Sequence, residues 1–68
     1  MDKIKILHDD DGEYGYPVGV ELSIEELFED FRHSDICSEE LYKYLCGIPI
    51  PAAVDQIAEM WGLEYAYL

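Results

Sequence analysis

The side chains that could take part in chemistry are mainly carboxylates, with two histidines and two cysteines beside them. Sixteen Asp and Glu residues oppose four Lys and Arg, so the formal net charge is −12 over 68 residues. General acid–base catalysis needs a pocket that separates the pKa values of two carboxylates, and a chain this short leaves little volume for one. The sequence has no glycine-rich phosphate loop and few cations to hold a phosphorylated substrate. We therefore expect no catalytic residues and a protein that is not an enzyme.

One stretch, Asp9–Asp11 followed by Gly12, is similar to a calcium-binding loop. An EF-hand with Gly12 at its sixth position would need ligands at Leu7 and Val18, its first and twelfth positions, and neither side chain carries an oxygen. Asp and Gly also tolerate the left-handed backbone of tight hairpins, so we interpret the stretch as a hairpin turn. We expect no metal and no cofactor here.

The cysteines, Cys37 and Cys46, are separated by eight residues, which fits neither a C-x-x-C redox pair nor a zinc knuckle. Adding His8 and His33 produces no common zinc-ligand spacing either. The chain has no apolar run of membrane-span length and no basic segment followed by an apolar stretch at its N-terminus. We expect a cytoplasmic protein with reduced thiols, which its negative charge keeps away from nucleic acid and anionic membrane.

The elements that must position these groups centre on one helix, predicted from Ser23 to Phe31. Ser23 is a typical N-cap, and Glu26 lies three residues later, where a capping box places its acidic residue. Apolar residues recur at i, i+3, i+4 and i+7, namely Ile24, Leu27, Phe28 and Phe31. The carboxylates of Glu25, Glu29 and Asp30 lie off this stripe. The helix is therefore expected to have an apolar core face and an acidic outer face.

Two segments before this helix have strand patterns. Residues 3–8 alternate, with Ile4 and Ile6 on one face. Residues 14–22 show the clearest period-two pattern in the chain, with tyrosine, valine and leucine at every second position. Pro17 cannot donate a ladder hydrogen bond, so this second strand is expected to be an edge strand or to be kinked at its middle.

Two further helices and a closing strand are predicted in the second half. Ser38 starts one helix and Gly47 ends it, with three inward-facing residues, Leu41, Tyr44 and Leu45. Pro51 starts the other and Gly62 ends it, with an apolar stripe of Val54, Ile57, Ala58 and Trp61. Residues 63–68 alternate and contain two tyrosines, which favours a strand, with helical continuation as the main alternative.

These elements predict one α+β domain over residues 1–68: a small antiparallel sheet, formed by a hairpin plus a C-terminal strand, packed against two or three helices. A core of this size is only marginally stabilising, so we expect a homodimer. The chain has six tyrosines and one tryptophan, more aromatic side chains than such a core requires. Tyr and Trp are favoured at protein interfaces, which predicts a protein partner.

The order of a short apolar strand, an aspartate turn, a tyrosine-rich strand through Tyr14 and Tyr16, and then Leu22-Ser23 and an acidic helix resembles the small phage p56-type inhibitors of uracil-DNA glycosylase. The resemblance covers about the first half of the chain, and the segment from Ser38 to Gly62 is longer than the family pattern. It implies a homodimer that mimics DNA, presents carboxylates to a basic groove of the enzyme, and receives an apolar side chain of the enzyme in a pocket at the dimer interface.

The predicted partner-binding residues combine the carboxylates with nearby aromatic rings: Glu21, Glu25, Glu26, Glu29, Asp30, Tyr14, Tyr16 and Phe28. The partner is expected to be a DNA-binding protein or enzyme with a basic groove. The alternative is a small interaction or regulatory subunit, like an antitoxin or adaptor, that binds through its aromatic patch. Ionic strength separates the two, because binding through carboxylates weakens with salt and binding through apolar burial hardly changes.

Overall fold

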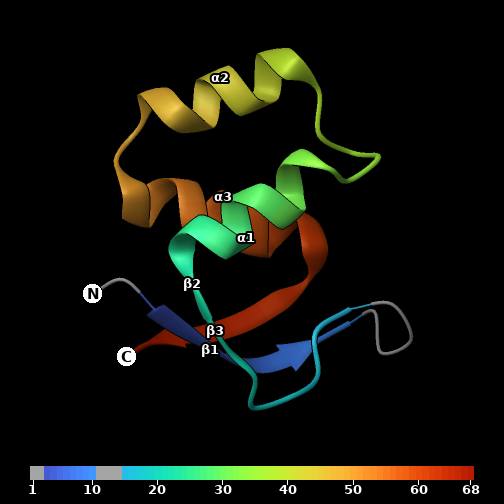
Figure 1. Cartoon of the computed structure of the whole chain (residues 1–68), viewed down its shortest axis with the longest axis vertical. Coiled ribbons are helices and arrows are strands. Elements are labelled where there is room, and N and C mark those ends of the chain that lie inside the picture. Colours follow the sequence, from blue (N-terminus) through green and yellow to red (C-terminus); the bar gives the residue numbers. More distant parts are fainter. Residues whose placement is uncertain (1–2, 11–14) are drawn as a thin grey trace.

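The computed structural model describes residues 3–10 and 15–68, which form a three-stranded antiparallel sheet and three helices. The chain order is β1 (Lys3–Asp9), β2 (Glu21–Ser23), α1 (Ile24–Arg32), α2 (Glu39–Gly47), α3 (Ile50–Trp61) and β3 (Leu63–Tyr67) (Figure 1). The predicted α+β class is confirmed, with three helices.

The sheet has the strand order β2-β1-β3, with β1 in the centre. Ile4 lies opposite Leu22 of β2 and Tyr67 of β3, and Ile6 lies opposite Tyr65. The register with β3 shifts between Ile6 and His8. Because side chains alternate along a strand, the inward-facing isoleucines place their neighbours Lys3 and Lys5 on the uncovered face of the sheet. The closing strand is confirmed, and the alternative of a helix through Leu68 is wrong.

The second predicted strand is mostly wrong, because regular pairing is confined to Glu21–Ser23. Before β2 the chain turns: the Val20 N–H donates to the Pro17 carbonyl at 3.2 Å, and Gly19 has a φ of +89°. The turn still borders β1, since the Gly19 N–H donates to the Ile6 carbonyl at 2.7 Å. The missing N–H of Pro17 and the left-handed Gly19 break the ladder in spite of the alternating side chains. Asp11, Gly12 and Tyr14, and with them half of the predicted hairpin turn, lie outside the described residues.

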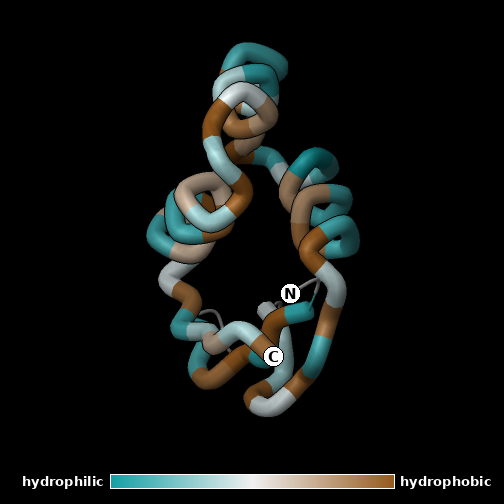
Figure 2. Tube along the Cα trace, turned by 90° about the vertical axis from the view of Figure 1, so that its left-hand side faces the viewer, coloured by the Kyte–Doolittle hydropathy of each residue, from teal (hydrophilic) through white to brown (hydrophobic). Residues whose placement is uncertain are grey.

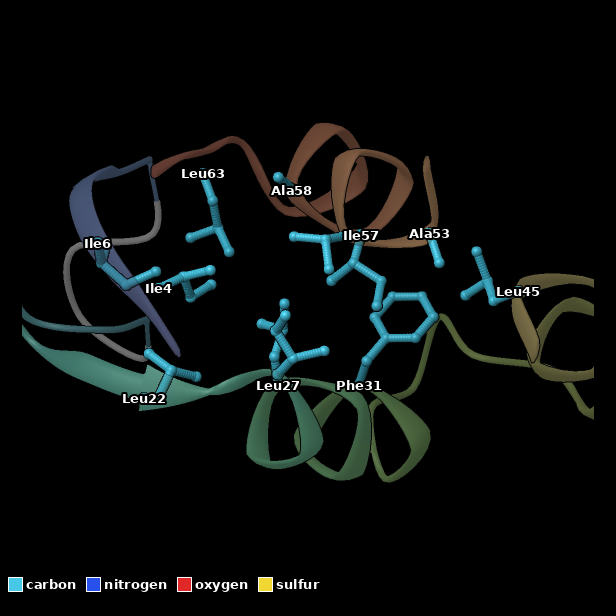
Figure 3. Packing of buried hydrophobic residues seen from close by; sticks show 12 residues of the cluster. Ile4, Ile6, Leu22, Leu27, Phe31, Leu45, Ala53, Ile57, Ala58 and Leu63 are labelled. Carbon is cyan, nitrogen blue, oxygen red and sulfur yellow. The ribbon is translucent and has the colours of Figure 1, made fainter. Parts of the chain in front are cut away.

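The three layers of the molecule are the sheet, the pair α1 and α3, and then α2, which lies farthest from the sheet (Figures 1 and 2). Side chains of all the elements meet between these layers (Figure 3). The fully buried ones with the largest volume are Phe31, Ile4, Ile6, Leu27, Leu45, Ile57 and Val54. The predicted stripes of α1 and α3 are confirmed as core faces, with Phe28 and Trp61 half-buried against the core. The prediction that Tyr44 of α2 faces inward is wrong. Its side chain is 57% exposed, because this outermost helix packs on one side only.

The predicted starts of α1 and α2 are confirmed by their caps, whereas α3 begins at Ile50, one residue before Pro51, with no side-chain cap. The Ser23 Oγ accepts a hydrogen bond from the Glu26 N–H at 3.1 Å, and the Ser38 Oγ accepts one from the Leu41 N–H at 3.1 Å. Each cap satisfies a backbone donor that the first turn of a helix leaves unpaired. The cap at Ser23 also fixes where β2 becomes α1, and so where the acidic residues of α1 begin.

Gly62 ends α3 in the left-handed conformation, with a φ of +67°, and directs the chain into β3. A Cβ at this position would lie 2.4 Å from Asp10 Oδ2. We expect Gly62→Ala to lower the free energy of unfolding by about 1–3 kcal/mol, the usual cost of a non-glycine residue held there. Gly47→Ala is the matched control, because its Cβ would meet nothing within 4 Å and its φ is not positive. Urea unfolding measures both, and equal losses would contradict the role given to Gly62.

Candidate protein-binding surface

The carboxylates of α1 form a continuous acidic face, defined here as Glu25, Glu26, Glu29 and Asp30. All four side chains are exposed, because the buried positions of the helix, Ile24, Leu27 and Phe31, point toward the sheet and α3. The four lie within five residue steps, or about 7.5 Å of helix axis at about 1.5 Å per residue. The four charges are separated by three intervals, so their mean spacing is about 2.5 Å of helix axis, which is of the same order as the roughly 1.7 Å per charge of duplex DNA.

The basic side chains nearest in sequence leave this charge largely uncompensated. Nε2 of His33 lies 3.0 Å from Oε1 of Glu29 and so reaches only one of the four carboxylates. The Arg32 guanidinium lies 5.4 Å from the ring centroid of Tyr42, on the side of α2. Within residues 3–10 and 15–68 both ion pairs are made by histidines, so no lysine or arginine there neutralises a carboxylate.

A surface depression of about 580 Å³, here called the aspartate pocket, lies next to the acidic face. Five segments meet around it: the end of β1, the turn before β2, the end of α1, the α1–α2 connection and the end of α3. Its lining residues are Asp9, Gly15, Tyr16, Asp30, Ser34, Asp35, Ile36, Met60 and Trp61. The pocket thus combines three carboxylates with two aromatic rings and two apolar side chains, and none of its lining residues is basic.

Tyr16 connects the parts of this pocket. Its hydroxyl donates to Oδ2 of Asp30 at 2.6 Å, and its backbone N–H donates to Oδ2 of Asp9 at 2.6 Å. Its ring meets Trp61 edge to face, with centroids 6.1 Å apart, and Trp61 in turn meets the buried Phe31 at 5.2 Å. Partial burial and the hydrogen bond to Asp30 raise the pKa of Tyr16 above its ordinary value near 10. Tyr16 therefore stays neutral and holds the Asp30 carboxylate in place.

Because the pKa of Tyr16 is raised in the folded state, part of the stability of the protein should be lost at alkaline pH. Above about pH 10 an unfolded tyrosine releases its proton while folded Tyr16 keeps it, so stability falls as pH rises through this range. We expect Tyr16→Phe to be less stable than the wild type at pH 8, because Asp30 loses a partner, and to lose less stability above pH 10. Urea unfolding at both pH values measures this, with Tyr44→Phe as the control for removing an exposed tyrosine hydroxyl. An unchanged alkaline slope in Tyr16→Phe would contradict it.

The structure brings only part of the predicted site together. Tyr16 and Asp30 meet at the aspartate pocket, beside the three glutamates of the acidic face. Glu21 does not join them: it is exposed on β2 opposite Lys5, on the uncovered face of the sheet. Phe28 is half-buried and lines a different depression, toward α2, together with Ile48 and Ile50. Tyr14 lies outside the described residues.

Residues outside the predicted partner-binding set complete the pocket, among them Asp35, Ile36, Met60 and Trp61. Trp61 had been predicted as part of a core stripe, and it is indeed half-buried, but one side of it reaches the pocket. Asp35 lay in a predicted break between helices, with no pattern of its own. Asp30 and Trp61 belong to different helices that are far apart in the sequence, so no local spacing marks them as neighbours.

The two cysteines line another depression, between Arg32 and Lys43, but they lie near opposite ends of α2. From Ser38 to Cys46 the helix rises about 12 Å, at about 1.5 Å per residue, which is too far for a disulfide between Cys37 and Cys46. Both are free thiols. Among the described residues, no helix has the length and apolar character needed to cross a membrane.

Comparison with known proteins adds no relative: no family model, curated protein or solved structure matches this chain. The class of protein is therefore defined by fold and surface alone, as a small acidic α+β protein with a carboxylate-covered helix. A function can be proposed only from the chemistry of that surface.

Proposed function

We propose that this chain is a non-catalytic, acidic protein that binds a basic groove of a DNA-binding protein by presenting carboxylates where DNA presents phosphates. The observation that carries the proposal is the acidic face of α1, whose exposed carboxylates are spaced along the helix axis at a distance of the same order as the phosphate charges of duplex DNA. Capping by Ser23 and packing of Leu27 and Phe31 hold this face on a rigid helix. A rigid array of charge binds with less loss of conformational entropy than a mobile acidic segment would.

The sharpest form of the proposal is inhibition of uracil-DNA glycosylase, as in the p56-type inhibitors. The order of an apolar strand, a second strand, an acidic helix and a closing strand supports it. The short β2 departs from the resemblance, and so does the segment from Ser38 to Gly62, which contains α2 and α3 and is longer than the family pattern. The enzyme is therefore proposed on the order of elements and on charge, and the fold allows other basic grooves as targets.

A homodimer in the cytosol completes the proposal. Both outer strands of the sheet, β2 and β3, are available for pairing in the described part of the chain, and an unpaired strand edge is a ready site for a second copy. The free thiols fit a reducing compartment. Sedimentation equilibrium over a range of protein concentrations tests the dimer directly.

The experiment that tests the proposed function is a titration of uracil-DNA glycosylase activity with this protein at about 50 mM and about 200 mM salt, a range over which contacts to several charges weaken steeply. We expect stoichiometric inhibition at the lower salt concentration and clear loss of inhibition at the higher one. The folded state of the protein is checked by circular dichroism at both concentrations. A folded protein that inhibits at neither concentration would discard the glycosylase as the target.

A second function, that of an adaptor-like subunit binding through apolar contacts, is favoured by one observation. Ile36 and Met60, at the rim of the aspartate pocket, are 51% and 39% exposed beside Trp61. A partner that covered these side chains would gain hydrophobic burial, which salt hardly weakens. Complex formation that is equally strong at both salt concentrations would therefore favour this second function over DNA mimicry.

A further inference from the structure

The aspartate pocket has the composition of a binding site for one particular side chain. Its apolar wall consists of Trp61, Met60 and Ile36, and its polar groups include the carboxylates of Asp30 and Asp35. A ligand that matches both must carry a positive charge and a surface that packs on an aromatic ring. Arginine meets both requirements, because its guanidinium is planar, weakly hydrated, stacks on aromatic faces and binds carboxylates through paired hydrogen bonds.

The hydrogen bonding of the pocket leaves acceptor atoms for such a ligand. Tyr16 occupies Oδ2 of Asp30, while Oδ1 of Asp30 has no hydrogen-bond partner among the described residues. The carboxylate of Asp35 is exposed and likewise has no partner within them. Asp30 is oriented by Tyr16, whose ring packs on Trp61, so the acceptor and the aromatic surface are held in a defined relation before a ligand binds. Preorganisation of this kind increases affinity.

The arginine must come from another molecule. The single arginine of this chain, Arg32, lies over the ring of Tyr42 and lines a different depression. An arginine is also the residue that a basic groove most readily offers, since it is enriched at the centres of protein interfaces and in the recognition of phosphate. We propose that the aspartate pocket binds an arginine side chain of the partner protein, next to the contacts made by the acidic face. This inference rests on the proposed function and names the side chain that anchors the partner.

The test uses Trp61, the only tryptophan of the chain, as its own reporter. Nα-acetyl-arginine amide is titrated into the full-length protein while Trp61 fluorescence is recorded, and Nα-acetyl-citrulline amide, of nearly the same shape but uncharged, is the matched ligand. We expect a saturable change with arginine amide and none with citrulline amide. Asp35→Asn should weaken binding about two- to five-fold, the usual worth of one partly exposed ion pair. Glu64→Gln, an equal change of charge at an exposed site on β3, should not.

Three outcomes count against the proposal. A response to citrulline amide equal to that with arginine amide would show that charge is not recognised, and an equal response to lysine amide would show that the guanidinium is not. Absence of a saturable response to arginine amide would discard the pocket, even if uracil-DNA glycosylase is still inhibited. Conversely, a normal arginine response without glycosylase inhibition would keep the pocket and discard only that enzyme as the target.

Discussion

Phe31→Ala should lower the free energy of unfolding by about 3–5 kcal/mol, the usual cost of removing a fully buried phenylalanine. Phe31 has no exposed surface, and its ring packs on Trp61 at 5.2 Å and points from α1 toward Ile57 of α3 (Figure 3). A domain of this length is stabilised by only about 3–10 kcal/mol, so the variant should be largely unfolded near room temperature or melt far below the wild type. Urea and thermal unfolding followed by circular dichroism measure the loss.

Phe28→Ala is the matched control, because it makes the same substitution on the same helix, three residues earlier. Phe28 is only half-buried, so less apolar surface is lost to water and a smaller cavity is left behind. Its cost should be clearly lower than that of Phe31→Ala. If the two variants lost equal stability, the placement of Phe31 at the centre of the core would be wrong.

The triple variant Glu25→Gln, Glu26→Gln and Glu29→Gln should show the largest change in partner binding. It removes three charges from the acidic face while leaving Asp30 bonded to Tyr16, so the aspartate pocket keeps its geometry. Hydrogen bonds from a basic groove to carboxylates are strengthened by charge, and we expect affinity for the glycosylase to fall by at least about 100-fold at low salt when three carboxylates are neutralised. The slope of the logarithm of affinity against the logarithm of salt concentration should also become shallower. The decrease in slope should be about the number of ion pairs that the variant no longer makes with the groove.

The matched control is Glu40→Gln, Glu59→Gln and Glu64→Gln, which changes the net charge equally at three exposed sites outside α1. It should leave affinity nearly unchanged, because its charges lie away from the acidic face. A small stability loss is expected for the first triple variant, since Glu25 and Glu26 lie in the first turn of α1 and favour its dipole. Circular dichroism of both variants shows whether they are folded, which separates a loss of stability from a loss of affinity. Equal losses of affinity in the two would mean that net charge acts alone, without a specific face.

The local features of this protein can be read from its amino-acid sequence. Ser23 and Ser38 mark helix starts because an N-cap depends only on the residue and the next few amides, and Gly62 marks a helix end because only glycine adopts the left-handed backbone without strain. The apolar stripes predicted the core faces of α1 and α3 for the same reason, since helical periodicity is a local property. The negative charge of the surface follows from composition alone.

Which residues share a surface depends on how the helices and strands pack. The long strand predicted for residues 14–22 became a turn and a short β2, because the pairing of a strand depends on its neighbour and not only on its alternation. The aspartate pocket joins Tyr16, Asp30, Asp35 and Trp61 from segments far apart in the chain. Contacts between distant segments arise from how the layers pack, and that packing is set by the whole core at once. Charge and helix ends are therefore legible in the sequence, whereas the pocket exists only in the fold.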